Sequence, residues 1–378
     1  MRVIVVGATG HIGTWLVPRL VRAGHEVIAV SRGARRPYQE SPEWQSVSMV
    51  SIDRETAELD GSFGPAIASL APDAVVDLIC FNAHSAAHIV DALRDRVKIF
   101  IHCGSLWVHG IPRTRPYDET APREPIGEYG IRKAEIERFL LDAAQEGFPA
   151  SVLHPGHITG PGWIPINPAG NLDVGVFERL MRGDVVTLPD DGMATLQHVH
   201  ADDVAQAFEL AIAKPESAIG ESFHVAAREP VTMRDYAEGV ASWSGRKAVL
   251  EYLPWNEWRK TVTERDAELT YDHMIHSPCA SIAKAEKRLG FAPKFSALDA
   301  VLDAVRDALA GFSGARNLAR RSSDRRRRVA RIGHPCQASS GWNPRSASSR
   351  GSISSPGCSC EPSSSRSPQT MQRPGQSG

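Results

Sequence analysis

The apolar positions of the first 160 residues fall into six short runs, and segments of helical periodicity separate these runs from one another. The runs are rich in Val and Ile and mostly lack a strict alternation of apolar and polar residues. Such runs are typical of strands that are buried on both faces of a parallel sheet. They lie at residues 2–7, 26–31, 46–53, 74–80, 98–103 and 150–156.

Amphipathic segments between these runs predict helices, because their apolar residues recur at helical spacing. The repeated strand–helix units predict an α/β fold with a doubly wound parallel sheet and right-handed crossovers. The predicted helices cover about residues 12–24, 63–70, 84–95 and 129–146.

The pattern changes after residue 156. A segment rich in Gly and Pro at residues 159–171 predicts a long loop of the kind that often carries function. We expect residues 1–160 to form the sheet domain and residues 161–312 to form a smaller lobe, partly woven back into it. Helices are predicted there near residues 173–182, 202–213, 232–244, 281–289 and 297–311, with two short strands among them.

The last part of the chain has a different composition. Residues 313–378 contain twelve Arg, no Lys and two acidic residues, which gives a net charge of +10 against −11 for the rest of the chain. They are rich in Ser, Pro and Gly and show no apolar periodicity, so we expect a disordered tail. The tail is either a contact for nucleic acid or an acidic surface, or a solvated or even accidental extension.

Composition also indicates a compartment. No apolar run reaches the 18 residues of a membrane span, and the short run after Met1 lacks the cleavage site of a secretion signal. The six Cys residues show neither a disulfide framework nor the spacing of a zinc site. We therefore expect a cytoplasmic protein without a membrane partner.

The strongest chemical signal is the segment GATGHIG at residues 7–13, which follows the first strand and opens the first helix. In this context the first glycine permits a tight turn and the second lets the backbone approach a pyrophosphate at the helix N-terminus. The third lets helix and strand pack closely. The predicted dinucleotide contacts are Gly7, Thr9, Gly10, His11, Ile12 and Gly13.

The second strand indicates which dinucleotide binds. It ends at Ser31 and Arg32, without the acidic residue that usually binds a ribose 2′-hydroxyl. Arginine offers fixed donors and a permanent charge for a 2′-phosphate, so the sequence favours NADP(H) over NAD(H). The alternative is a solvated loop. Asp53, at the end of the third strand, is either a partner for the adenine amino group or half of a surface pair with Arg54.

Tyr129 and Lys133 are four residues apart at the start of a predicted helix, so their side chains share one face. A lysine ammonium beside a phenol favours the phenolate, which suits proton transfer. A helix surface pair is the alternative. The position between the fifth and sixth strands of a dinucleotide fold favours the active site.

Together these motifs resemble an extended, partly atypical short-chain dehydrogenase/reductase of the NAD-dependent epimerase/dehydratase family. The resemblance covers about residues 1–312. It implies a Rossmann-type sheet, with residues 1–160 as the NAD(P)-binding domain and residues 161–312 mainly as a substrate-binding lobe. It rests on the segments GATGHIG, CGSLWVHG, YGIRK, LHPGHITGPG and HVHADDVAQAF.

The resemblance assigns roles to single residues. Ser105 would hydrogen-bond the substrate oxygen, Tyr129 would act as general acid or base, and Lys133 would hold the nicotinamide ribose. The further cofactor contacts it implies are Leu78, Ile79, Cys80, Pro155, Gly156 and His157. The candidate substrate contacts are Trp107, His109 and Trp163.

Departures from the family pattern narrow the chemistry. Leu106 and Trp107 follow Ser105 at the positions where dehydratases of the family carry two acids, so we do not expect dehydration. Leu196 stands where nucleotide-sugar epimerases often carry an arginine, and His154 replaces another arginine. Both changes weaken the case for a nucleotide-sugar substrate.

A group of histidines and aspartates imitates a metal site. His198 and His200 would share one face of a strand, whereas Asp202 and Asp203 begin a helix and suit N-terminal capping. We therefore predict no metal. His102 is expected to be a satisfied core residue.

The sequence thus predicts an NAD(P)-dependent enzyme, an oxidoreductase or epimerase that moves hydride to or from a small sugar, alcohol or ketone. The alternative is a non-catalytic member of the same fold that senses a cofactor or binds nucleic acid. The intact Ser105, Tyr129 and Lys133 argue against that alternative. We do not expect a nucleic-acid partner, for which the tail is the only candidate contact, and the resemblance suggests a homodimer.

Overall fold

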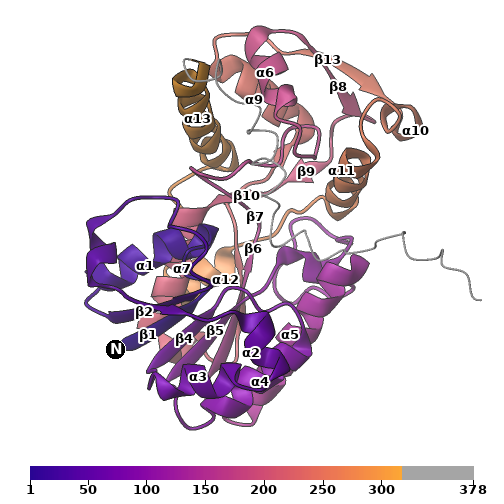
Figure 1. The fold of residues 1–378 in the computed structure, drawn as a ribbon. Coiled ribbons are helices and arrows are strands. Elements are labelled where there is room, and N and C mark those ends of the chain that lie inside the picture. The colour runs from indigo at the N-terminus through magenta and orange to yellow at the C-terminus, as the bar shows by residue number, and fades with distance from the viewer. Residues whose placement is uncertain (317–378) are drawn as a thin grey trace, which may run out of the picture. The chain divides into compact units, whose positions relative to one another are not determined.

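Six of the seven strands of the central sheet come from the six apolar runs of the sequence (Figure 1). The computed structural model describes the backbone of residues 1–316 and the side chains of residues 1–308. All strands pair in parallel in the order β11-β6-β5-β4-β1-β2-β3, which confirms the predicted doubly wound α/β fold. The strands are β1 (Arg2–Val6), β2 (Glu26–Ser31), β3 (Ser48–Ser51), β4 (Ala74–Asp77), β5 (Ile99–Cys103), β6 (Ala150–Pro155) and β11 (Ser222–Val225).

Helices cover both faces of the sheet, which explains why most residues of its central strands are apolar. In β1, Val3 and Val5 belong to one core, while Ile4 and Val6 belong to the core on the opposite face. The first core includes residues of α1 (His11–Arg22), α7 (Ala201–Ala213) and α12 (Ala283–Leu289). The second includes residues of α3 (Phe63–Ser69), α4 (Ala83–Leu93) and α5 (Gly127–Gln145).

A third core lies in the segment that follows β6. It is built around a two-stranded parallel sheet of β8 (Val185–Pro189) and β13 (Val249–Leu253). Strand β11 returns to the central sheet beside β6, and α7 and α12 pack there too. The chain after residue 160 therefore contributes to both regions. The helices that pack around the third core are α6 (Gly175–Arg182), α9 (Met233–Trp243), α10 (Trp255–Trp258), α11 (Glu264–His276) and α13 (Ala297–Arg316).

Several short elements complete the described chain. The 3-10 turns are η1 (Pro42–Ser46) and η2 (Leu106–His109), and the short helices are α2 (Arg54–Leu59) and α8 (Pro215–Ala218). The short strands are β7 (His157–Thr159), β9 (Thr195–Leu196), β10 (His198–His200) and β12 (Val231–Thr232). None of the helices described is long and apolar enough to cross a membrane.

The predicted tail lies almost entirely outside the described residues. Helix α13 extends to Arg316, four residues into the segment 313–378. The described residues all belong to one unit of the chain, residues 1–339.

Candidate active site

The predicted site residues gather at the carboxyl ends of β1 to β6. Strand order reverses between β1 and β4, because β2 and β3 follow β1 on one side while β4, β5 and β6 extend the sheet on the other. Ligands of open α/β sheets bind in the crevice at such a switch point. The turn after β1 and the segment Leu78–Cys80 after β4 flank it, and the Leu78 amide donates to the Val6 carbonyl at 3.1 Å.

The glycine turn has the geometry of an anion site. A Cβ on Gly13 would lie 2.2 Å from the Ala8 carbonyl oxygen, so this position requires the close approach that only glycine allows. Gly10 is the N-cap of α1, no side chain caps the helix, and its first turn carries no acid. The positive end of the helix dipole therefore remains for an anion, which fits a dinucleotide pyrophosphate.

Aromatic rings lie beside this turn. Trp163, from the Gly- and Pro-rich loop, stacks on the His11 ring with centroids 4.7 Å apart, and Tyr38 meets the Trp163 ring edge-on at 5.9 Å. Trp163 was predicted as a substrate contact. Its position puts the loop against the turn predicted to hold the pyrophosphate, and its contact with a substrate stays a prediction.

The ends of β2 and β3 present the residues predicted to choose the cofactor. Ser31 is buried and Arg32 is exposed, with no ion pair to another described residue. Asp53 caps α2, accepting from the Thr56 amide at 3.1 Å. The alternative pairing of Asp53 with Arg54 is wrong, because Arg54 is buried and bonds both oxygens of Asp77 at 2.8 and 2.9 Å.

Lys133 reaches from α5 to the ends of two strands. Its side chain is only 2% exposed, and its Nζ donates to the Cys80 carbonyl at 2.8 Å and the Cys103 carbonyl at 2.7 Å. The ammonium has three donors, so these bonds leave one for a ligand hydroxyl. Burial raises the pKa of the Cys80 thiol to about 12, so this cysteine stays protonated.

Ser105 is the N-cap of η2, and η2 packs against α5, the helix that carries Tyr129. The Ser105 Oγ caps η2 by accepting from the Trp107 amide at 3.3 Å, and its own O–H proton has no acceptor among the described residues. The Trp107 ring meets the Tyr129 ring edge-on at 5.9 Å, and Lys133 Nζ lies 6.0 Å from the Tyr129 ring centre. The serine hydroxyl therefore has a proton available for another partner.

A group of histidine rings borders Trp107. His276 stacks on Trp107 with centroids 4.2 Å apart, and His273 lies 4.9 Å from His157. His198 is fully buried next to His157, and neither of its ring nitrogens reaches a hydrogen-bond partner. Burial lowers the pKa of His198 to about 3 and that of His273 to about 4, so both rings are neutral at pH 7. Neutral rings give no charge to attract a phosphate.

Of the remaining cofactor positions, Pro155 ends β6 and His157 begins β7. Gly156 between them donates to the Val225 carbonyl at 3.0 Å, and a Cβ on it would lie 2.3 Å from the Gln197 carbonyl oxygen. This tight crossing holds His157 at the carboxyl edge of the sheet, and its contact with the nicotinamide stays a prediction.

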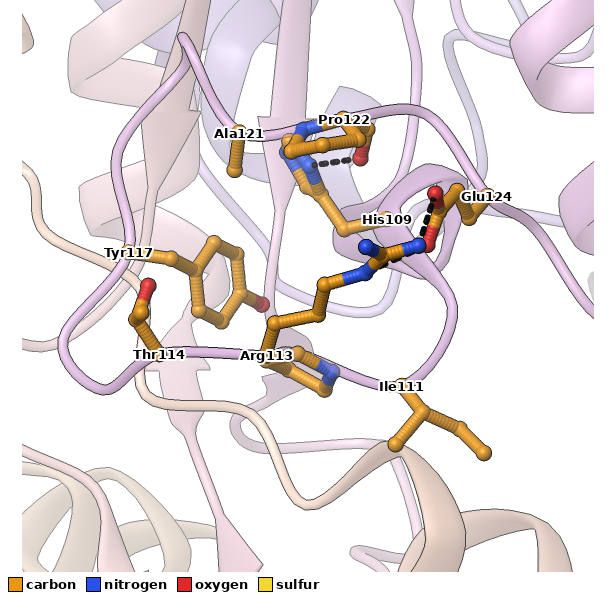
Figure 2. Close-up of a pocket in the computed structure, with 9 residues that line it drawn as sticks. His109, Ile111, Arg113, Thr114, Tyr117, Ala121, Pro122 and Glu124 are labelled. Carbon is orange, nitrogen blue, oxygen red and sulfur yellow. Dashed lines mark hydrogen bonds and ion pairs between the residues drawn. The ribbon is translucent and has the colours of Figure 1, made fainter. Parts of the chain in front are cut away.

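His109 departs from its predicted role at the substrate. It is buried, its Nδ1 donates to the Pro122 carbonyl at 3.1 Å, and its Nε2 lies 2.8 Å from Nε2 of His224. Both nitrogens are therefore engaged by protein. The ring instead borders a small pocket of about 30 Å³ under residues 111–124, where Arg113 pairs with Glu124 (Figure 2). Of the predicted site residues, this pocket contains His109 alone.

The histidine–aspartate segment has a structural role. His200, and not an aspartate, caps α7, because its Nδ1 accepts from the Asp202 amide at 3.0 Å. Asp202 pairs with Arg19 at 2.6 Å, and Asp203 accepts from the Lys294 and Phe295 amides. Among residues 1–308, no group of His, Cys, Asp and Glu has a geometry that could hold a metal ion.

Sequence reasoning missed two features of the site. Helix α11, which carries His273 and His276, was not predicted, although Thr263 caps it by accepting from the Asp266 amide. A threonine three residues before an acid is a recognisable helix start. Glu137 was also missed, although it lies four residues beyond Lys133 on the same helix.

These observations define the class of protein. The chain belongs to the NAD dependent epimerase/dehydratase family, whose family model matches residues 3–226. It is 30% identical over 255 residues to 2′-dehydrokanamycin reductase of Streptomyces kanamyceticus, covering 65% of this chain and 67% of that protein. It is 28% identical over 273 residues to a UDP-glucose 4-epimerase of Mycolicibacterium smegmatis, covering 67% and 86%.

Two further comparisons add to this. A chloroplast stem-loop binding protein of 41 kDa from Arabidopsis thaliana is 25% identical over 314 residues, covering 80% of this chain and 78% of that protein. The fold matches the solved structure of UDP-glucose 4-epimerase from Thermotoga maritima with a TM-score of 0.64 at 22% identity. That match covers 82% of this chain and all of the other. The chain thus belongs to an enzyme family whose members include reductases and epimerases.

Proposed function

We propose that this protein is an NADP(H)-dependent reductase that acts on a ketone or sugar carbonyl, or in reverse on the alcohol. The observation that carries the proposal is the arrangement of Ser105, Tyr129 and Lys133 around the ends of β4 and β5. Ser105 has an O–H proton to donate, and Lys133 has one donor left after two backbone bonds. An epimerase would use the same residues twice without net consumption of cofactor.

The residues of the chain would divide the work as follows. When bound, NADPH supplies the hydride. Ser105 would orient the carbonyl oxygen, and the Tyr129 phenol would donate the proton to the oxygen that becomes an alkoxide. The buried ammonium of Lys133 would bind ribose hydroxyls and stabilise the phenolate left after proton transfer.

Dehydration fits the site less well. Leu106 and Trp107 follow Ser105 in η2, and neither side chain can exchange a proton with a leaving hydroxyl. The neutral His273 next to Trp107 brings no positive charge for a nucleotide diphosphate, which also favours an uncharged substrate. His154 no longer contributes to that choice, because it is fully buried and bonded to protein groups.

The test is a screen for NADPH oxidation at 340 nm across ketones, aldehydes and sugars, with product identification by NMR. Turnover with net oxidation supports the reductase. Formation of an epimer without net oxidation supports the epimerase. Absence of both, together with tight cofactor binding, favours the non-catalytic alternative.

Arg32→Ala should raise the KM for NADPH at least tenfold and leave the KM for NADH nearly unchanged. The exposed guanidinium at the end of β2 is free to pair with a 2′-phosphate, and a charge-assisted bidentate pair contributes about 1.5–3 kcal/mol. Initial-rate kinetics with both cofactors measure the effect, and Arg182→Ala, which removes an exposed arginine of α6, is the control. Equal effects on NADPH and NADH would contradict the preference for NADP(H).

A second candidate function rests on the stem-loop binding relative, which matches most of the chain. If this protein binds RNA instead, a labelled RNA hairpin should bind with micromolar or tighter affinity, and affinity should fall steeply with salt. The same measurement on residues 1–316 would show whether the Arg-rich segment carries that binding. We further propose a homodimer, which size-exclusion chromatography with light scattering can test.

A further inference from the structure

A buried series of polar contacts joins Ser105 to helix α5. The Ser105 backbone amide donates to Nδ1 of His154 at 3.0 Å, and Nε2 of His154 lies 3.0 Å from Oε1 of Glu137. Arg123 then binds both oxygens of Glu137, at 3.0 and 2.6 Å. His154 and Glu137 are almost completely buried, so water competes little for these bonds.

The direction of these bonds follows from the groups involved. An amide only donates through its N–H, so Nδ1 of His154 must carry the lone pair. The proton of a neutral ring then sits on Nε2, which lies against the Glu137 carboxylate but is not aligned for a full hydrogen bond. Burial disfavours the carboxylate of Glu137, but His154 and Arg123 outweigh it and hold the pKa of Glu137 well below its usual range. A permanent carboxylate thus fixes one tautomer of His154.

Two sequence features make this series of contacts possible. A Cβ on Gly104 would lie 2.3 Å from Nδ1 of His154, so only glycine lets the ring reach the Ser105 amide. Tyr129, Lys133 and Glu137 are four residues apart along α5, one turn from each to the next. One helix therefore carries the proposed proton donor, its ammonium partner and the carboxylate of the series.

We propose that Glu137 and His154 are positioning residues that set where Ser105 lies relative to Tyr129. The inference rests on the proposed function, since it assigns Ser105 and Tyr129 to one reaction. The Ser105 amide is held through His154 to the helix that presents Tyr129, so the hydroxyl and the phenol keep a fixed separation. Small displacements of such groups cost large factors in rate.

The test compares Glu137→Gln, His154→Phe and the double variant, using the carbonyl compound that the wild type reduces fastest with NADPH. Each single variant should lower kcat at least tenfold. The KM for NADPH and the Kd for NADPH should stay within threefold of the wild-type values. Because both residues act through the same contact, the kcat of the double variant should be no lower than that of the more impaired single variant. Glu221→Gln is the matched control, since Glu221 also pairs with two cations, Lys284 and Arg288, but has no bond to Ser105.

The outcomes separate this inference from the proposed function. Unchanged kcat in folded variants, or losses that multiply in the double variant, would overturn the positioning role. A second measurement needs no substrate: the 15N–1H amide signal of Ser105 should shift in both single variants and not in Glu221→Gln. If the wild type reduces no carbonyl, the proposed function fails, and an unmoved Ser105 signal would overturn the link as well.

Discussion

Replacing Tyr129 by phenylalanine is expected to lower kcat for carbonyl reduction about 10²- to 10⁴-fold, the usual contribution of a positioned general acid. Phenylalanine keeps the ring, so the edge-on contact with Trp107 at 5.9 Å should persist. Lys133 keeps its bonds to the Cys80 and Cys103 carbonyls, because they do not involve the phenol. Cofactor binding should therefore change less than threefold.

Steady-state NADPH oxidation gives kcat, and quenching of intrinsic fluorescence gives the Kd for NADPH. Tyr252→Phe is the matched control, because Tyr252 lies exposed on β13 and loses the same hydroxyl. Full activity of the Tyr129 variant would show that no phenol proton is needed. In this kinetic assay another group would then protonate the substrate oxygen, whereas full function of the same variant in a cell-based assay would favour the cofactor-sensing or nucleic-acid-binding alternative.

The strands of the central sheet could be predicted, because the apolar residues of each strand identify it without knowledge of the strands beside it. The run at residues 74–80 is apolar except for Asp77, and β4 is indeed buried on both faces. The helices between such runs follow from their periodicity. Helix α11 was harder to predict, because most of its residues are polar and only a few of them are buried. Tertiary contacts, rather than an apolar pattern in the sequence, determine which face of this helix is buried.

The site was predictable where a residue type serves one local geometry. Gly13 is an example, because the carbonyl oxygen of Ala8, only five residues earlier in the chain, leaves no room for a Cβ at position 13. The partners of His109 and His154 were not predictable, since His224 and Glu137 come from distant parts of the chain. The sequence shows that a histidine is present, but only the fold decides whether its nitrogens face a substrate or the protein.

His102 illustrates the same limit. It was expected to be a satisfied core residue, and it is fully buried in β5. Neither of its nitrogens has a hydrogen-bond partner, and burial, aided by Lys133, lowers its pKa well below the ordinary value. Keeping several buried histidines neutral costs free energy of folding, and this cost grows as the pH falls.

Stability is therefore expected to fall steeply as the pH drops from 7 to 5. An unfolded histidine has a pKa of about 6.5, whereas the folded pKa of His198 is about 3 and that of His273 about 4. Below pH 6.5 each of these histidines binds a proton in the unfolded chain but not in the folded protein. Their contribution to the free energy of unfolding is therefore fully present above pH 6.5 and is lost as the pH falls toward their folded pKa values. Each residue should contribute about 2 kcal/mol of this loss, or about 4 kcal/mol together.

Urea unfolding at pH 7, 6 and 5 measures the loss. His198→Phe removes a titrating ring that has no hydrogen bond to lose, so its stability should fall by about 2 kcal/mol less over this range than that of the wild type. His84→Gln, at an exposed position of α4, should follow the wild-type curve. A wild-type stability that stays level down to pH 5 would mean that the buried rings take up protons in the folded state. The histidine group next to Trp107 would then be open to water and able to carry charge at the proposed substrate site.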